Sequence, residues 1–143
     1  IELAFHDEAT DAAYLKDPEF RADSSRAIYR GIADYFAERD GLTATYLPEP
    51  PESVALTHNE NGRLQVTFSP GPAGFPFGDD ATDFVVFTSK DGRSWDNGLD
   101  AESSPVGLDT AAEEVVFVRV AARNAGGISF PSEVVGARRS GGA

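Results

Sequence analysis

Carboxylates are the most numerous groups in this sequence that could do chemistry, and many of them gather in its second half. There they form two sets of three aspartates, namely Asp79, Asp80, Asp83, Asp91, Asp96 and Asp100. Carboxylate oxygens are hard ligands of the kind that Ca²⁺ prefers, but the spacing matches no EF-hand loop. Aspartate also caps turns through its own side chain. We therefore predict that these residues cap loops and that this chain holds no metal.

Histidine and cysteine offer little for a metal or nucleophilic site. The chain has two histidines and no cysteine, which excludes disulfides, thiolate nucleophiles and cysteine-rich zinc sites. Apolar and polar residues alternate over residues 1–6, which predicts a strand with Glu2 and His6 on one face. Those two residues would stand about 13 Å apart, too far for a direct hydrogen bond. His58 lies in a turn-like stretch and is not predicted to be functional.

Three aromatic residues lie in or beside predicted loops and turns. Phe75 and Phe77 stand among prolines and glycines in Gly71–Gly78, and Trp95 precedes an Asp-Asn-Gly turn. Exposed rings can stack on sugar rings, so these residues are candidate carbohydrate contacts. The alternative is that the rings fill the edge of a β-sandwich or dock on a helix. The sequence leaves both alternatives open.

Length, composition and charge limit the class of protein. With 143 residues, 41% hydrophobic and 25% charged, the chain is typical of a folded protein of one or two domains. Its 24 acidic and 12 Lys or Arg residues give a net charge of −12, which disfavours nucleic-acid and anionic membrane partners. The longest strongly apolar run, Val115–Val118, is far too short to cross a membrane. Because the sequence begins with Ile1 and has no methionine, we expect it to be a piece of a longer product.

The first part of the chain has helical periodicity. Asp17–Gly41 is predicted to be a helix because six apolar residues recur at spacings of three and four, namely Phe20, Ala27, Ile28, Ile32, Tyr35 and Phe36. Asp17 suits the N-cap, Pro18 the first helical position and Gly41 the position after the end. A shorter helix is predicted over Thr10–Lys16.

The shorter helix would be capped by Asp7 or Thr10. One strand and two helices cannot bury their apolar faces without a sheet, and residues 1–41 contain no such sheet. The missing sheet must therefore come from elsewhere, or the N-terminal region is frayed.

The second part of the chain has the short strands of an all-β module. A linker over residues 42–48 leads into it. Seven strands are predicted, over Ser53–Thr57, Arg63–Phe68, Asp83–Ser89, Ser94–Trp95, Ser104–Leu108, Glu114–Arg123 and Ser132–Ala137. Glycine-containing turns separate them, at Asn61-Gly62, Asp91-Gly92, Asn97-Gly98 and Ala125-Gly126-Gly127. Seven strands in about 90 residues predict a sandwich of two sheets.

The β-module resembles a fibronectin type III domain. An Arg-Val strand, an Asn-Ala-Gly-Gly turn and a Pro-Ser-Glu strand within Val118–Glu133 resemble the last two strands of that family, and Pro50–Pro70 resembles its opening strands. Phe68 stands where the family has a tryptophan, and Val116 stands at the tyrosine-corner position. The resemblance implies an immunoglobulin-like sandwich over residues 49–139, followed by a disordered tail at 140–143.

The first 36 residues resemble the C-terminal end of the zinc-dependent N-acetylmuramoyl-L-alanine amidase catalytic domain. The resemblance rests on Ile-Glu-Leu-Ala-Phe-His-Asp-Glu at the start, Leu15–Arg21 and Ser25–Ile32. It implies that Glu2 matches the glutamate that accepts a proton from zinc-bound water. His6 is a candidate either to orient Glu2 or to line the cleft. The zinc ligands would lie in sequence that this chain lacks, so the chain alone is expected to be inactive.

Together these observations predict a mostly β chain, with a strand and two helices from an α/β amidase domain at 1–41 before the sandwich. We expect the C-terminal part of a bacterial cell-wall hydrolase, secreted or periplasmic, with the sandwich as spacer or targeting module. The expected partners are peptidoglycan or another polysaccharide and the upstream remainder of the catalytic domain. The alternatives are a non-catalytic module that binds a polysaccharide or a protein, and a purely structural spacer.

Overall fold

The computed structural model describes residues 2–109 and 115–138. The chain divides into two compact units, Ile1–Thr45 and Tyr46–Ala143, and the division falls within the predicted linker. The predicted tail at 140–143 lies outside the described residues. No helix in the described part of the chain is long and apolar enough to cross a membrane.

The first unit consists of two consecutive helices, α1 (Ala9–Lys16) and α2 (Pro18–Arg39). Asp17 separates them: its Oδ1 accepts a hydrogen bond from the backbone N of Glu19 at 2.9 Å, which confirms it as the N-cap of α2. The predicted cap of α1 was wrong. Glu8 takes that place, because its longer side chain reaches the backbone N of Asp11, with Oε2 at 2.9 Å.

The strand predicted at residues 1–6 is wrong for the residues that are described. Residues 2–6 form no strand, because a strand needs the hydrogen bonds of a neighbouring strand and the first unit supplies only helices. The backbone N of Phe5 donates instead to Asp11 Oδ2 at 2.9 Å, and the carbonyl of Phe5 accepts from the backbone N of Glu8 at 3.3 Å. The segment therefore folds back onto the start of α1.

The first unit has no core among its described residues. None of residues 2–45 is buried, and the apolar stripe of α2 remains on the surface, with Ile32 50% and Tyr35 63% exposed. Tyr14 and Phe20 join the two helices, with ring centroids 5.4 Å apart. The sequence predicted the helix correctly, but nothing within this unit covers its apolar face.

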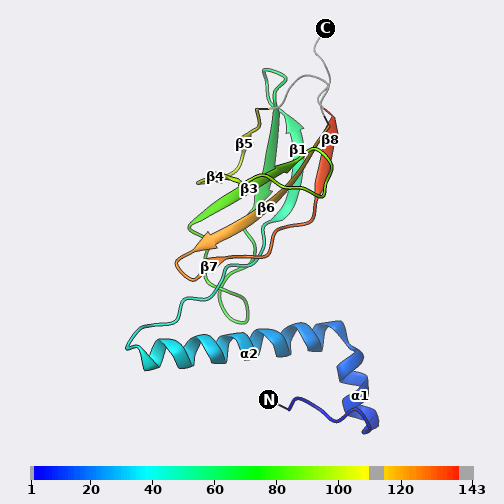
Figure 1. Cartoon of the computed structure of the whole chain (residues 1–143), viewed down its shortest axis with the longest axis vertical. Helices are drawn as coiled ribbons and strands as arrows, with labels where there is room; N and C mark the ends of the chain where they lie inside the picture. The colour runs from blue at the N-terminus through cyan, green and yellow to red at the C-terminus, as the bar shows by residue number, and fades with distance from the viewer. Residues whose placement is uncertain (1, 110–114, 139–143) are drawn as a thin grey trace. The chain divides into compact units, whose positions relative to one another are not determined.

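The second unit is a sandwich of two antiparallel sheets (Figure 1). One sheet has the order β1-β2-β5, with bounds Glu52–His58, Leu64–Ser69 and Val106–Gly107. The other sheet has the order β4-β3-β6-β7, and β8 also pairs with β6. Its strands are β3 (Asp83–Ser89), β4 (Leu99–Ala101), β6 (Val115–Asn124), β7 (Gly127–Ile128) and β8 (Val135–Arg138). The mostly β fold class is thus confirmed.

The core lies between the two sheets and follows the alternation of the strands. Its buried members are apolar residues from both sheets, namely Val54, Leu64, Val66, Phe68, Phe84, Val86, Leu108, Val116, Val118, Val120 and Ala122. Phe68 packs against Phe84 across the core, with centroids 4.8 Å apart. Phenylalanine therefore fills the position at which the family resemblance expects tryptophan.

Two predicted strands differ from the observed ones in the β3–β5 region. No strand forms at Ser94–Trp95, and the backbone N of Ser94 donates to the carboxylate of Asp91 at 2.8 Å rather than to a neighbouring strand. β4 forms later, where Leu99–Ala101 pairs with β3. The strand predicted over Ser104–Leu108 is reduced to β5, since Pro105 has no N–H to donate to a ladder.

The last predicted strand begins three residues later than expected. Before β8, the hydroxyls of Ser129 and Ser132 accept hydrogen bonds from the backbone N of Ala122 and Val120, at 2.9 and 3.0 Å. Serine side chains thereby replace regular strand pairing beside β6. The strand predicted from Glu114 begins at Val115 among the described residues, and Glu114 itself lies outside them.

Candidate functional site

The main candidate site is a groove in the second unit, which we call the acidic groove. It encloses about 440 Å³ and is formed by the chain entering β1, the loop between β2 and β3, and the segment between β7 and β8. Its apolar lining includes four prolines and one ring, namely Pro50, Pro51, Pro72, Pro131 and Phe77. Three glutamates also line it, namely Glu49, Glu52 and Glu133. The groove thus combines a stiff apolar surface with negative charge.

Close backbone packing fixes the loop that forms one side of the groove. A Cβ on Gly71 would collide with the carbonyl oxygen of Pro50, and a Cβ on Gly78 would collide with that of Leu47. Only glycine permits so close an approach of two backbones. In addition, Asp79 Oδ2 accepts a hydrogen bond from the backbone N of Tyr46 at 2.8 Å. The loop is therefore held against residues 46–50.

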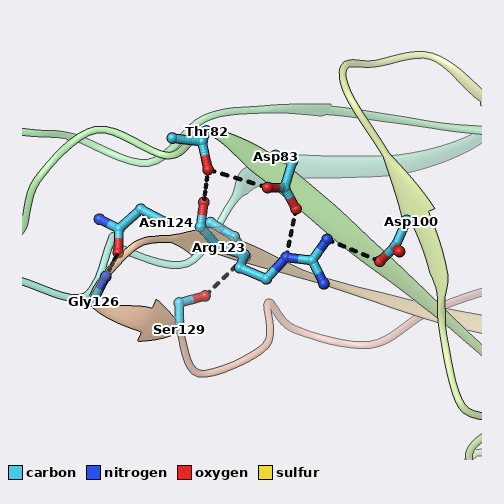
Figure 2. A network of polar contacts seen from close by, with 8 residues as sticks. Thr82, Asp83, Asp100, Arg123, Asn124, Gly126 and Ser129 are labelled. Atoms are coloured by element: carbon cyan, nitrogen blue, oxygen red, sulfur yellow. Dashed lines mark hydrogen bonds and ion pairs between the residues drawn. The ribbon is translucent and has the colours of Figure 1, made fainter.

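Asn124 connects the same region to the end of β6. Its Nδ2 donates to the carbonyl oxygens of Tyr46 and Asp80, at 2.8 and 3.3 Å. Its Oδ1 accepts from the backbone N of Gly126 at 2.8 Å (Figure 2). One buried side chain thus ties the chain entering the sandwich, the β2–β3 loop and the β6–β7 turn together.

Arg123 anchors the start of β3 in the same network. Figure 2 shows its guanidinium between two carboxylates, with Nε 2.6 Å from Asp83 Oδ1 and Nη2 3.1 Å from Asp100 Oδ1. The hydrogen bond to Asp83 and the charge of both aspartates raise the pKa of Arg123. Thr82 completes the network, since its Oγ1 is 3.1 Å from both Asp83 Oδ2 and the carbonyl oxygen of Arg123.

The structure separates the three aromatic residues that the sequence singled out. Phe77 lines the acidic groove, and Phe75, from the same loop, is 88% exposed. Trp95 lies in the β3–β4 connection, where the guanidinium of Arg119 packs over its ring at 4.3 Å from the centroid. Arg119 also lies 5.4 Å from the centroid of Phe87. A carbohydrate role for these rings stays a prediction.

Trp95 belongs to a second groove, of about 460 Å³, which it lines together with Asp91 and Asp96. Asp91 accepts hydrogen bonds from the backbone N of Ser94 and of Arg93, both at 2.8 Å, and these lower its pKa to about 2. Asp96 Oδ1 accepts from the backbone N of Gly98 at 3.0 Å. The predicted capping of turns by aspartate is therefore confirmed at both residues.

Asp96 also ties this connection back to β3. Its two carboxylate oxygens accept from the backbone N and the Oγ1 of Thr88, at 3.0 and 2.7 Å. Burial acts to raise the pKa of Asp96, but these bonds outweigh it and lower the pKa. The described residues include no group of three His, Cys, Asp or Glu side chains arranged to hold a metal ion.

The residues assigned through the amidase resemblance lie in the first unit. Glu2 and His6 are both exposed in the segment that precedes α1. His58 ends β1 in the second unit, so the division of the chain separates the two histidines. The roles of Glu2 and His6 stay predictions.

A third concave surface follows the apolar stripe of α2. It encloses about 550 Å³ and is lined by Leu3 and by residues of the helix that include Ile28, Gly31, Ile32 and Phe36. The sequence predicted this stripe, but it did not predict the acidic groove. The groove prolines come from three separate segments, and only their folding together brings them to one surface.

Comparisons with known proteins show the fold of the second unit. No family model and no curated protein matches the chain. Among solved structures, domains A168-A170 from titin superpose with a TM-score of 0.56 at 21% identity, covering 66% of this chain and 33% of that one. The twitchin kinase region from C. elegans gives 0.55 at 19%, covering 66% and 17%.

A third similar structure contains the FN1-FN3 domains of chicken CNTN1, with a TM-score of 0.52 at 18% identity, covering 66% of this chain and 33% of that one. This chain therefore spans a third or less of each of the three structures. Identities this low show the fold alone. The β-sandwich of this chain has the fold of a fibronectin type III domain.

Proposed function

We propose that this chain is a non-catalytic binding module that attaches through its β-sandwich to a polysaccharide or a protein. The observation that carries the proposal is the anchored β2–β3 loop, which presents Phe75 to solvent and Phe77 to the acidic groove. A large exposed ring costs free energy in water and loses little conformational entropy on binding, so it suits recognition. Loops held on a rigid scaffold commonly carry such contacts.

The polysaccharide form of the proposal assigns Phe75 as the platform for a sugar ring, with Trp95 as a separate contact. The test is retention of the whole chain on insoluble peptidoglycan and chitin, compared with the Phe75→Ala variant. Leu99→Ala is the matched control, because Leu99 is also exposed but lies on β4, an edge strand of the five-stranded sheet, and not in the β2–β3 loop. We expect Phe75→Ala to weaken retention about tenfold and the control to leave it unchanged. Equal retention of all three proteins would contradict the assignment.

A second proposal, favoured by the open apolar face of α2, makes the first unit part of a cell-wall amidase. A helix with an apolar stripe gains most of its stability by burying that stripe, yet none of residues 2–45 is buried. The upstream remainder of an α/β catalytic domain would cover it. In this proposal Glu2 accepts the proton from the attacking water, His6 lines the cleft, and the zinc ligands belong to the upstream remainder. The enzyme would act outside the cytoplasm, where peptidoglycan lies.

The amidase proposal is tested with the protein that the gene encodes, including any sequence upstream of Ile1. Release of L-alanine-terminated peptides from purified peptidoglycan is measured for that protein and for its Glu2→Gln variant. We expect the variant to lose more than about 100-fold in rate, since a general base is removed. Glu60→Gln, an exposed change in the sandwich, is the matched control. Full activity in Glu2→Gln would contradict the role of Glu2, and an inactive parent would contradict the proposal.

A further inference from the structure

The acidic groove indicates a class of ligand, and this inference rests on the proposed function as a binding module. The walls of the groove are already ordered without a ligand. Proline side chains have fixed rings, and the loop that carries Pro72 and Phe77 is held by the close packing of Gly71 and Gly78 on backbone. A surface that is already ordered loses little entropy when a ligand binds. Its volume of about 440 Å³ falls within the range of ligand-binding pockets.

The charge of the groove selects the sign of its ligand. Three glutamates and no lysine, arginine or histidine line it. Glu52 and Glu133 are exposed, and neither side chain makes a hydrogen bond or ion pair within residues 2–109 and 115–138. The whole chain carries a net charge of −12, which adds to the negative potential. A ligand with positive charge is therefore favoured both at the groove and on its approach.

The backbone at the groove is irregular in a way that suits an extended peptide. Ser53 has a φ of +53°, which is rare for a residue with a Cβ, and a bulge shifts the register of β1 against β2 between Glu52 and Ala55. The register shift falls at Ser53 and Val54, which both line the groove. Bulges leave backbone polar groups unpaired, and such groups can pair with the main chain of another segment.

From these three features we infer that the acidic groove binds an extended, cationic peptide segment, with lysine or arginine side chains at the glutamates and an apolar or proline side chain against Phe77 and the prolines. The groove contains a single aromatic ring, that of Phe77, which is half-buried. A sugar platform needs an exposed ring, and Phe75 is 88% exposed outside the groove. The peptide and the sugar are thus assigned to different side chains.

The test is an ¹⁵N-resolved NMR titration of the whole chain with a ten-residue probe peptide that alternates Lys, Pro and Leu. The same peptide with Glu in place of Lys is the control ligand. The groove variant is Glu52→Gln with Glu133→Gln, and the matched protein control is Glu60→Gln with Glu102→Gln, which removes the same charge from exposed positions outside the groove. Superimposable spectra without peptide establish that each variant is folded.

We expect the lysine peptide to shift amide signals of Val54, Ser132 and Glu133, and the groove variant to raise its Kd by about fivefold. The control variant should stay within about twofold, and salt should weaken binding because the attraction is screened. No shift with the lysine peptide, equal shifts with the glutamate peptide, or equal Kd values for the two double variants would each overturn the inference. Peptidoglycan retention that persists while the peptide fails would overturn the peptide assignment and leave the proposed binding module standing.

Discussion

Gly78→Ala is the substitution that tests most directly whether the β2–β3 loop is locked to the chain entering the sandwich. A Cβ at Gly78 collides with the backbone of Leu47, including its carbonyl oxygen and the carbon attached to it. Backbone cannot rotate away as a side chain can. The loop or residues 46–50 must therefore move, and the hydrogen bond between Asp79 and the backbone N of Tyr46 would be strained with them.

The expected cost is that of overpacking a tight contact, about 1–3 kcal/mol in the free energy of unfolding. A cost of about 2 kcal/mol in a sandwich of this size lowers the Tm by roughly 8–16 °C. Gly107→Ala is the matched control. Gly107 has no heavy atom within 4 Å of an added Cβ and no positive φ, so the same change there should alter stability by less than about 0.5 kcal/mol.

Thermal unfolding of the whole chain followed by the fluorescence of Trp95 measures both variants, because the chain has only one tryptophan and it reports on the sandwich. Gly78→Ala should also weaken ligand binding at the acidic groove, since Phe77 adjoins the displaced residue. A Tm for Gly78→Ala that equals that of Gly107→Ala would refute the close backbone packing. A large loss of Tm with unchanged ligand binding would show that the loop geometry does not shape the groove.

Three further predictions concern the sandwich. Leu64→Ala should cost about 2–5 kcal/mol in urea unfolding because Leu64 is 1% exposed. Asp91 has a folded pKa of about 2, below its ordinary value of 3.8, so its stabilising effect is present above about pH 4 and lost toward pH 2. Asp91→Asn should therefore reduce the loss of Tm over that range. Arg119→Lys should lower stability by about 0.5–1 kcal/mol and shift Trp95 emission to the red, because ammonium cannot replace the planar guanidinium on the ring.

The sandwich could be predicted from sequence because its signals are local. A short apolar run followed by a turn signal predicted the bounds of β3, Asp83–Ser89, without error, and the Asn-Gly and Asp-Gly pairs marked turns whose glycines do have positive φ. Such patterns depend on which face of a strand is buried and on which residue tolerates a turn. The core positions of β2, Phe68 among them, follow the alternation of that strand.

Contacts made by side chains with distant backbone were beyond that kind of prediction. Ser132 replaces part of a strand ladder by accepting a hydrogen bond from the backbone N of Val120. In the same way, the carboxylate of Asp96 accepts one from the backbone N of Thr88. Neither residue type signals this in sequence, because serine and aspartate occur in many loops. The acidic groove was missed for a similar reason: its prolines come from three segments that only the fold brings together.

The first unit shows a different limit. Periodicity predicted the helix and Asp17 predicted where it begins, since both depend on the chain's own residues. The partner that covers the stripe cannot be predicted in this way, because the same apolar stripe can pack against a sheet, another helix or a second protein. A helix of 22 residues with no buried side chain rests mainly on its intrinsic propensity, which is marginal in water. The open face of Ile32 and Phe36 is therefore the feature of this unit that most requires a partner.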